Sequence, residues 1–182
     1  IRLKPLLQLA FAAFVGLLPA TVLAATDGEP AAASADRIAL WPRGMAPGDK
    51  PLSQAQRIVE RSSDPALPDR YIDHVSTPYL VAYRPAKPND SALLVIPGGG
   101  YQRVVLDKEG TALVPALVEQ GGVTLFVLRY RLPGEGRADR EAALADAQRA
   151  LRLIRHRASE WGLDPQRIGT MGFSAGGHLA AR

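Results

Sequence analysis

Apolar runs separated by turn residues divide this chain into alternating strands and helices. Ala92–Ile96 and Val123–Leu128 are continuous apolar runs, as expected of strands that are buried on both faces. Three further segments are predicted as strands because β-branched, aromatic or apolar residues lie between turn residues. These segments are Tyr71–Val75, Tyr79–Arg84 and Arg167–Met171.

Helical spacing of apolar residues follows several of these strands. Across Asp139–Trp161, apolar residues recur every three or four positions and form one stripe that would face a sheet. A second helix is predicted over Lys108–Gln120, where Gly121-Gly122 would end it. The alternation of strands and helices predicts a single domain of the α/β class, with a mostly parallel sheet and helices on both faces.

The N-terminus has the pattern of a secretory signal peptide. Arg2 and Lys4 precede an apolar run over residues 6–18, and Val22-Leu23-Ala24 offers small residues for cleavage before Ala25. A transmembrane anchor is the alternative, although the apolar run is short for a membrane span. We expect residues 1–24 to be removed, and the mature protein to be secreted or periplasmic without stable membrane association.

Composition narrows the functional classes. The net charge of +4 includes Arg2 and Lys4, so the remainder carries +2 (4 minus 2), too little to indicate nucleic-acid binding. The chain contains no cysteine, which excludes disulfides, thiolate metal sites and a cysteine nucleophile. Residues 25–37 are rich in Ala, Gly, Pro and Ser and are predicted to be a flexible leader.

The most specific motif is Gly172-Phe173-Ser174-Ala175-Gly176, which lies between a predicted strand and a helical start. A serine with glycine two positions before and after it, at such a corner, is typical of a nucleophile elbow. The turn is so sharp that side chains at both glycine positions would collide with neighbouring backbone. Ser174 is therefore the candidate nucleophile, and the alternative is a serine that caps a helix.

A second glycine motif, Gly98-Gly99-Gly100, follows the carboxyl end of the predicted strand 92–96, where open α/β sheets place their sites. Glycine lets the backbone approach a substrate and point N–H groups toward it. We predict that the amides of Gly99, Gly100 and Ala175 form an oxyanion hole; a simple glycine-rich turn is the alternative. Tyr101 either lines the substrate entrance or packs at the end of this loop.

The runs Pro97–Tyr101 and Gly172–His178 resemble those of the α/β-hydrolase superfamily. More narrowly, the chain resembles the secreted esterases grouped with acetylxylan esterases and related carbohydrate deacylases, some of which are called xylanases. Three intervening runs also match that group, and the resemblance extends from about Leu40 to the end. These runs are Tyr130–Pro133, Asp146–Ala150 and Asp164–Gly169.

This resemblance implies an α/β-hydrolase fold and a serine carboxylesterase that deacetylates polysaccharide or oligosaccharide. It implies no cofactor and no metal, and a small-molecule or carbohydrate ester as the partner. The related lipase motif begins with histidine, where this chain has Pro97. A peptidase of the prolyl-oligopeptidase type, whose elbow is similar, and a non-catalytic relative are the alternatives.

The other two members of a catalytic triad are not evident. In this fold the acid and the histidine follow the serine, and only eight residues follow Ser174. His178 would lie on the helix behind the elbow, and His74 and His156 precede the serine. We expect that the triad Asp and His are not in this chain, and that residues 38–182 are the N-terminal part of the domain, truncated after the elbow. Asp146 is expected to brace a loop or an arginine.

Overall fold

A computed structural model of the chain describes residues 35–47, 49–135 and 141–182. The predicted signal peptide and most of the predicted leader lie outside these ranges. The leader prediction is wrong at its C-terminal end, because strand β1 (Asp36–Ala39) already includes residues 36 and 37. Its backbone pairs antiparallel with Tyr79–Ala82, and this pairing orders the chain two residues earlier than composition suggested.

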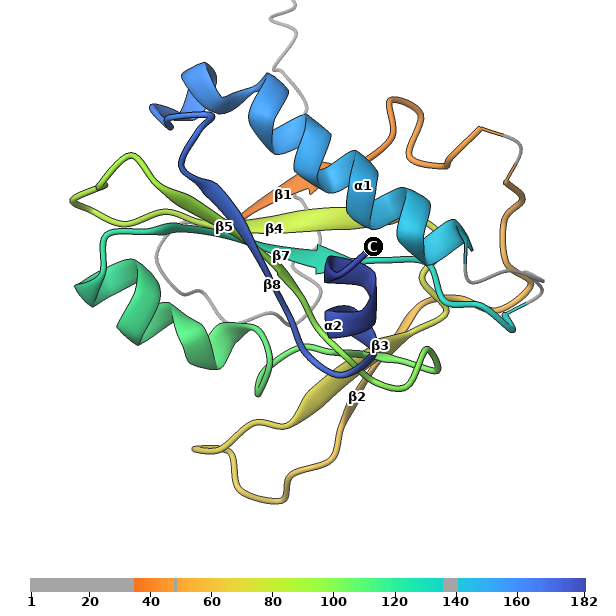
Figure 1. Cartoon of the computed structure of the whole chain (residues 1–182). Coiled ribbons are helices and arrows are strands. Elements are labelled where there is room, and N and C mark those ends of the chain that lie inside the picture. Colours follow the sequence, from red (N-terminus) through yellow and green to blue (C-terminus); the bar gives the residue numbers. More distant parts are fainter. Residues whose placement is uncertain (1–34, 48, 136–140) are drawn as a thin grey trace, which may run out of the picture.

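The main sheet has five strands in the order β1-β4-β7-β5-β8 (Figure 1). Strands β7, β5 and β8 are parallel, as the predicted alternation requires, whereas β4 pairs antiparallel with both β1 and β7, so the sheet is mixed. Strand β8 lies at one edge of the sheet in the described part of the chain. The bounds are β4 (Tyr79–Tyr83), β5 (Ala92–Ile96), β7 (Thr124–Arg129) and β8 (Ile168–Gly172).

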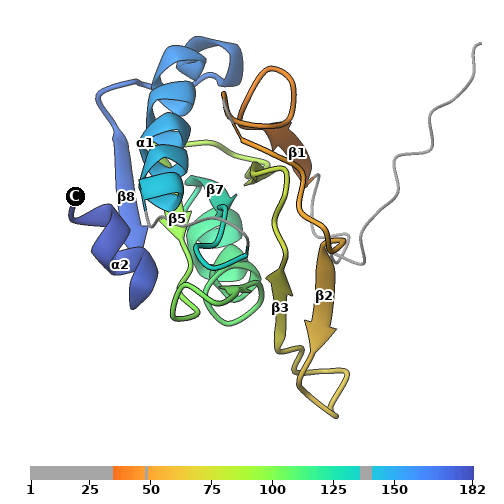
Figure 2. The same ribbon diagram turned by 90° about the vertical axis from the view of Figure 1, so that its right-hand side faces the viewer.

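Helices cover both faces of this sheet (Figure 2). Helix α1 (Glu141–His156) packs on one face, where its buried alanines and Ile154 join the larger apolar cluster with Leu94 and Phe126. On the other face, Val114 and Val118 pack with the remaining side chains of β5 and β7. Because the central strands are buried on both sides, they lack alternating polar positions.

The segment predicted as a helix over residues 108–120 is helical only in part. It consists of a 3₁₀ turn, η1 (Thr111–Leu113), and a π-helical stretch, η2 (Val114–Gln120). Pro115 lies in the first turn of η2, where a residue without an N–H group is tolerated. At the end of the stretch, the Gly121 N–H donates to the Ala116 carbonyl at 3.0 Å, five residues back.

The long predicted helix ends earlier than its apolar stripe suggests. Helix α1 stops at His156, and a separate 3₁₀ turn, η3 (Ala158–Trp161), carries the stripe on to the core. Gly162, with φ of +66°, ends η3 in the left-handed conformation. The predicted start of the helix at Asp139 lies outside the described residues.

A small antiparallel sheet, β2-β3-β6, lies beside the loop that follows β5. It consists of β2 (Arg57–Glu60), β3 (Arg70–Asp73) and β6 (Val104–Val105), of which only β3 was predicted. Strand β6 follows the glycine loop directly and pairs with β3. This pairing places the β2–β3 hairpin next to the candidate site. Within the described ranges, the helices are too short or too polar to cross a membrane.

Candidate active site

Ser174 lies at the corner between β8 and helix α2 (Ala175–Ala180) in a strained backbone conformation. Its φ is +48° and its ψ is −114°, which a non-glycine residue rarely adopts. The side chain is exposed and makes no capping hydrogen bond to the helix. The alternative role of a helix cap is therefore not realised, and the hydroxyl is presented to solvent.

The two glycines of the elbow stand where side chains do not fit. A Cβ at Gly172 would lie 2.6 Å from the Gly177 nitrogen. One at Gly176 would lie 2.6 Å from the carbonyl carbon of Ile96 and closer still to its oxygen. Both separations are shorter than real Cβ contacts, so the collision expected from the sequence is present in the structure.

The glycine loop after β5 meets the elbow. The Phe173 N–H donates to the Ile96 carbonyl at 3.1 Å, and a Cβ at Gly98 would lie 3.1 Å from the Ser174 Cβ. Gly99 and Gly100 have φ of +131° and +64°, so the loop needs glycine at both positions. Packing thus brings the two sequence motifs, about 75 residues apart, into contact.

The amides that were predicted as oxyanion donors are available. Within the described ranges, the N–H groups of Gly99, Gly100 and Ala175 donate to no acceptor, whereas the neighbouring Gly98 N–H is already used. Gly99 and Gly100 line the same pocket as Ser174, and Ala175 directly follows the serine at the start of α2. A carbonyl oxygen that enters this pocket would meet donors without displacing an existing hydrogen bond.

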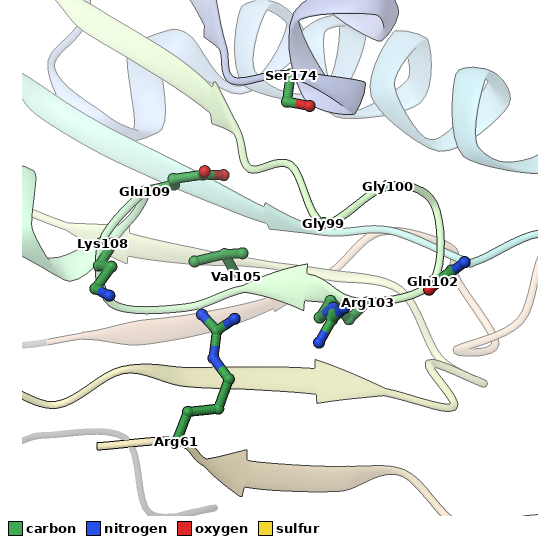
Figure 3. Close-up of a pocket in the computed structure, with 9 residues that line it drawn as sticks. All are labelled: Arg61, Gly99, Gly100, Gln102, Arg103, Val105, Lys108, Glu109 and Ser174. Carbon is green, nitrogen blue, oxygen red and sulfur yellow. The ribbon is translucent and has the colours of Figure 1, made fainter. Parts of the chain in front are cut away.

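Two side chains hold the glycine loop, and sequence reasoning assigned this role to neither. The Tyr130 hydroxyl donates to the Pro97 carbonyl at 2.8 Å, and burial raises the pKa of this phenol, so it stays a donor. The Glu109 carboxylate accepts the Gly98 N–H at 2.6 Å and points toward Ser174 (Figure 3). Nothing in the sequence around Glu109 signals this role, because the contact depends on the path of the loop. Together they provide bracing where the related motif has a histidine.

Tyr101 and His178 join the glycine loop to helix α2. The Tyr101 hydroxyl lies 2.6 Å from the His178 Nδ1, and the two rings meet edge to face. Tyr101, at φ of +62°, packs against the core and is not among the residues that line the Ser174 pocket. Of its two predicted roles, the structure therefore favours packing at the loop's end over the substrate entrance.

The pocket beside Ser174 has a volume of about 390 Å³. Its described lining contains no histidine, and Glu109 supplies its carboxylate (Figure 3). His74 instead contacts the Asp73 carboxylate through Nδ1 at 2.8 Å. The described ranges also contain no group of three His, Asp or Glu side chains that would hold a metal ion.

Asp146 is a structural brace, as the sequence predicted. It is fully buried and accepts hydrogen bonds from the Arg131 guanidinium at 2.8 and 2.9 Å, and from the Trp41 indole at 2.9 Å. Burial alone would lower the pKa of Arg131, but the bonds to Asp146 and Asp49 outweigh it and raise the pKa. This network ties the segment that carries Trp41 and Asp49 to α1, and none of its residues lines the Ser174 pocket.

Comparison with known proteins shows which family this chain resembles. The BD-FAE family model matches residues 79–182. An acetylxylan esterase of Xylanibacter ruminicola is 37% identical over 102 residues, which cover 56% of this chain and 20% of the relative.

Solved structures agree in fold. An acetyl ester-xyloside bifunctional hydrolase from Caldicellulosiruptor lactoaceticus matches with a TM-score of 0.56 and 34% identity, covering 80% of this chain and 45% of that one. An α/β hydrolase enzyme from a Medee basin deep-sea metagenome library matches with a TM-score of 0.50 and 29% identity, covering 69% and 50%. The chain thus spans half the length of these proteins or less. Since the family match includes β4, β5, β7, β8 and the whole elbow, the chain belongs to the BD-FAE family and has the α/β-hydrolase fold.

Proposed function

We propose that this chain carries the nucleophile and the oxyanion donors of a secreted or periplasmic serine carboxylesterase, which removes acetyl groups from polysaccharide or oligosaccharide. One observation carries the proposal. The exposed Ser174 hydroxyl, on a strained corner, lines the same pocket as the amides of Gly99 and Gly100, which have no acceptor among the described residues.

The reaction follows from these positions. Ser174 Oγ adds to the ester carbonyl, and the carbonyl oxygen becomes an oxyanion that accepts the N–H groups of Gly99, Gly100 and Ala175. Each donor lowers the barrier by about 3 kcal/mol when it is placed before the charge develops. The tetrahedral intermediate then expels the alcohol and leaves an acyl group on Ser174, which water removes in a second addition and elimination.

The Ser174 proton needs a general base, and the alcohol needs a proton as it leaves. No histidine lines the pocket among the described residues, and we propose that a histidine outside this chain supplies this group. Glu109 is already hydrogen bonded to the glycine loop, and we assign it to holding the loop.

The names of similar proteins support the substrate class. The acetylxylan esterase and the acetyl ester-xyloside hydrolase both combine an acetyl ester with a xylose-based compound in their names. An acetyl group is small, and the pocket beside Ser174 leaves most of its volume to the alcohol part of such a substrate.

The test compares the full-length protein with its Ser174→Ala variant. We expect the wild type to release 4-nitrophenol from 4-nitrophenyl acetate and acetate from acetylated xylo-oligosaccharides, and the variant to lose both activities. A fluorophosphonate probe should label the wild type alone. Undiminished turnover by Ser174→Ala would refute the assignment, and faster cleavage of an aminoacyl-proline amide than of the esters would favour a peptidase.

A further inference from the structure

The far wall of the Ser174 pocket is formed by basic side chains that the ester chemistry does not use. Arg61, Arg103 and Lys108 line the pocket, and they lie on the side opposite to Ser174 (Figure 3). They come from two separate places in the chain, the β2–β3 hairpin and the segment that follows the glycine loop. Their convergence therefore depends on the tertiary fold.

Two of these cations share one carboxylate. The Arg61 Nη2 lies 2.5 Å from Asp69 Oδ1, and the Lys108 Nζ lies 2.8 Å from Asp69 Oδ2. The single negative charge of Asp69 thus faces two positive charges, so one positive charge of Arg61 and Lys108 is not neutralised by it.

Arg103 has no carboxylate partner in the described part of the chain. Its guanidinium lies 5.1 Å from the centre of the Tyr71 ring, and that of Arg61 lies 5.6 Å from the same ring. The backbone N–H of Arg103 also donates to the Gly99 carbonyl at 3.3 Å, which fixes the backbone of this residue to the glycine loop. Arg103 is therefore held in position while its charge stays available.

The acidic residue of the pocket lies on the other side. Glu109 points toward Ser174 and is hydrogen bonded to the Gly98 N–H. The pocket lining carries three positive charges and the negative charge of Glu109. When the charge of Asp69, which pairs with two of the cations, is included, the net charge of these groups is +1 (3 minus 2). An anionic group in this pocket would be repelled from Glu109 and attracted to the wall that carries Arg103.

We propose that this basic wall, with Arg103 as its principal cation, is a subsite for a carboxylate on the alcohol part of the substrate. The inference rests on the proposed function. An acetyl group has no atom that could carry a negative charge, so the carboxylate must belong to the alcohol part of the ester. The preferred substrate is then an acetylated sugar or oligosaccharide that also bears an acidic group, such as a uronic acid. A guanidinium suits this task because its planar donors match a carboxylate in two places.

The experiment measures binding without turnover. The Ser174→Ala variant of the full-length protein is titrated with 4-acetoxybenzoate and with its uncharged methyl ester, and the dissociation constants are obtained by ligand-observed NMR. We expect the charged ligand to bind about threefold more tightly, the effect of one partly exposed ion pair. Adding Arg103→Gln should abolish this preference. Adding Arg103→Lys, which keeps the charge but loses the two planar donors, should retain only part of it.

Two further variants make the test specific. Lys108→Gln should reduce the preference less than Arg103→Gln, because Asp69 already offsets the Lys108 charge. Arg152→Gln, on the exposed side of α1 and outside the pocket, is the matched control and should change nothing. Thermal unfolding of every variant shows whether it is folded.

Equal affinities for the two ligands, no binding of either, or a preference that survives Arg103→Gln would overturn the subsite. The proposed function is tested separately, by hydrolysis of the methyl ester with Ser174 intact. If that hydrolysis fails while the preference for the charged ligand persists in Ser174→Ala, the esterase assignment falls and the anion subsite stands.

Discussion

Gly176→Ala perturbs the contact on which the elbow depends. The added Cβ would lie 2.6 Å from both the Ile96 carbonyl carbon and the Pro97 oxygen, and closer still to the Ile96 oxygen. Non-bonded carbon contacts are favourable at about 3.5 Å, so the backbone must move by about 1 Å. All of these atoms are backbone at the end of the central strand β5, and no side chain can rotate away.

The expected cost has two parts. Overpacking of this kind destabilises folded proteins by about 1–3 kcal/mol, and we place Gly176→Ala at about 3 kcal/mol because only backbone can yield. A shift of about 1 Å between Ser174 and the glycine loop should lower kcat/KM about 100-fold. Gly169→Ala is the control on the adjoining strand, where the nearest atom to the new Cβ is Leu93 Cδ1 at 3.4 Å. There we expect a gain of about 0.5 kcal/mol, because alanine loses less backbone entropy than glycine.

The assay is chemical denaturation of the full-length wild type and both variants, together with the hydrolysis of 4-nitrophenyl acetate. The reasoning fails if the unfolding free energies of Gly176→Ala and Gly169→Ala agree within about 1 kcal/mol and both variants hydrolyse the ester at the wild-type rate. That result would mean that the corner is not packed against the end of β5.

Tyr101→Phe removes the hydrogen bond to His178, which helps to place the glycine loop. We expect kcat to fall about fivefold with KM nearly unchanged, the effect of losing one hydrogen bond. A change in KM alone, measured by steady-state kinetics, would contradict this role. Burial alone would raise the pKa of Asp107, but hydrogen bonds from Arg70 outweigh it and lower the pKa. Asp107→Asn should therefore destabilise the protein by about 2 kcal/mol at pH 7, and the difference should shrink from about pH 4 downward as the wild-type carboxylate is protonated; a difference independent of pH in denaturation experiments would refute this. Export from a bacterial host should yield a mature protein that begins at Ala25, and mass spectrometry that finds residues 1–24 retained would exclude cleavage there.

Most strands of the main sheet could be predicted from the local pattern of apolar and turn residues. The bounds of β5 match the apolar run 92–96, and β4, β7 and β8 lie within one residue of their predicted limits. Helix α1 ends at His156, five residues before its predicted end at Trp161 (161 minus 156). The regular apolar runs of these elements reflect a sheet with two covered faces. Predictions failed where strand pairing intervened, as at the first two residues of β1, which composition placed in a leader. They also failed over residues 111–120, where a 3₁₀ turn and a π-helical stretch replace the predicted regular helix.

The elbow and the glycine loop were found from sequence because each is a short segment whose conformation only glycine permits. The partners of these segments were not found, because they depend on contacts between distant parts of the chain. Glu109 on the Gly98 amide, Tyr130 on the Pro97 carbonyl and Tyr101 on His178 all form across loops or elements.

The amino-acid sequence by itself determined the order of strands and helices and the presence of a serine at a tight corner. Both follow from interactions within a few residues, namely hydrophobic periodicity and the steric limits of a sharp turn. Only the tertiary structure decided that the serine faces unpaired amides across one pocket, and that arginines 42 residues apart meet on its far wall (103 minus 61). Those contacts exist because packing of the sheet and the hairpin brings separate segments together, and no local pattern encodes them.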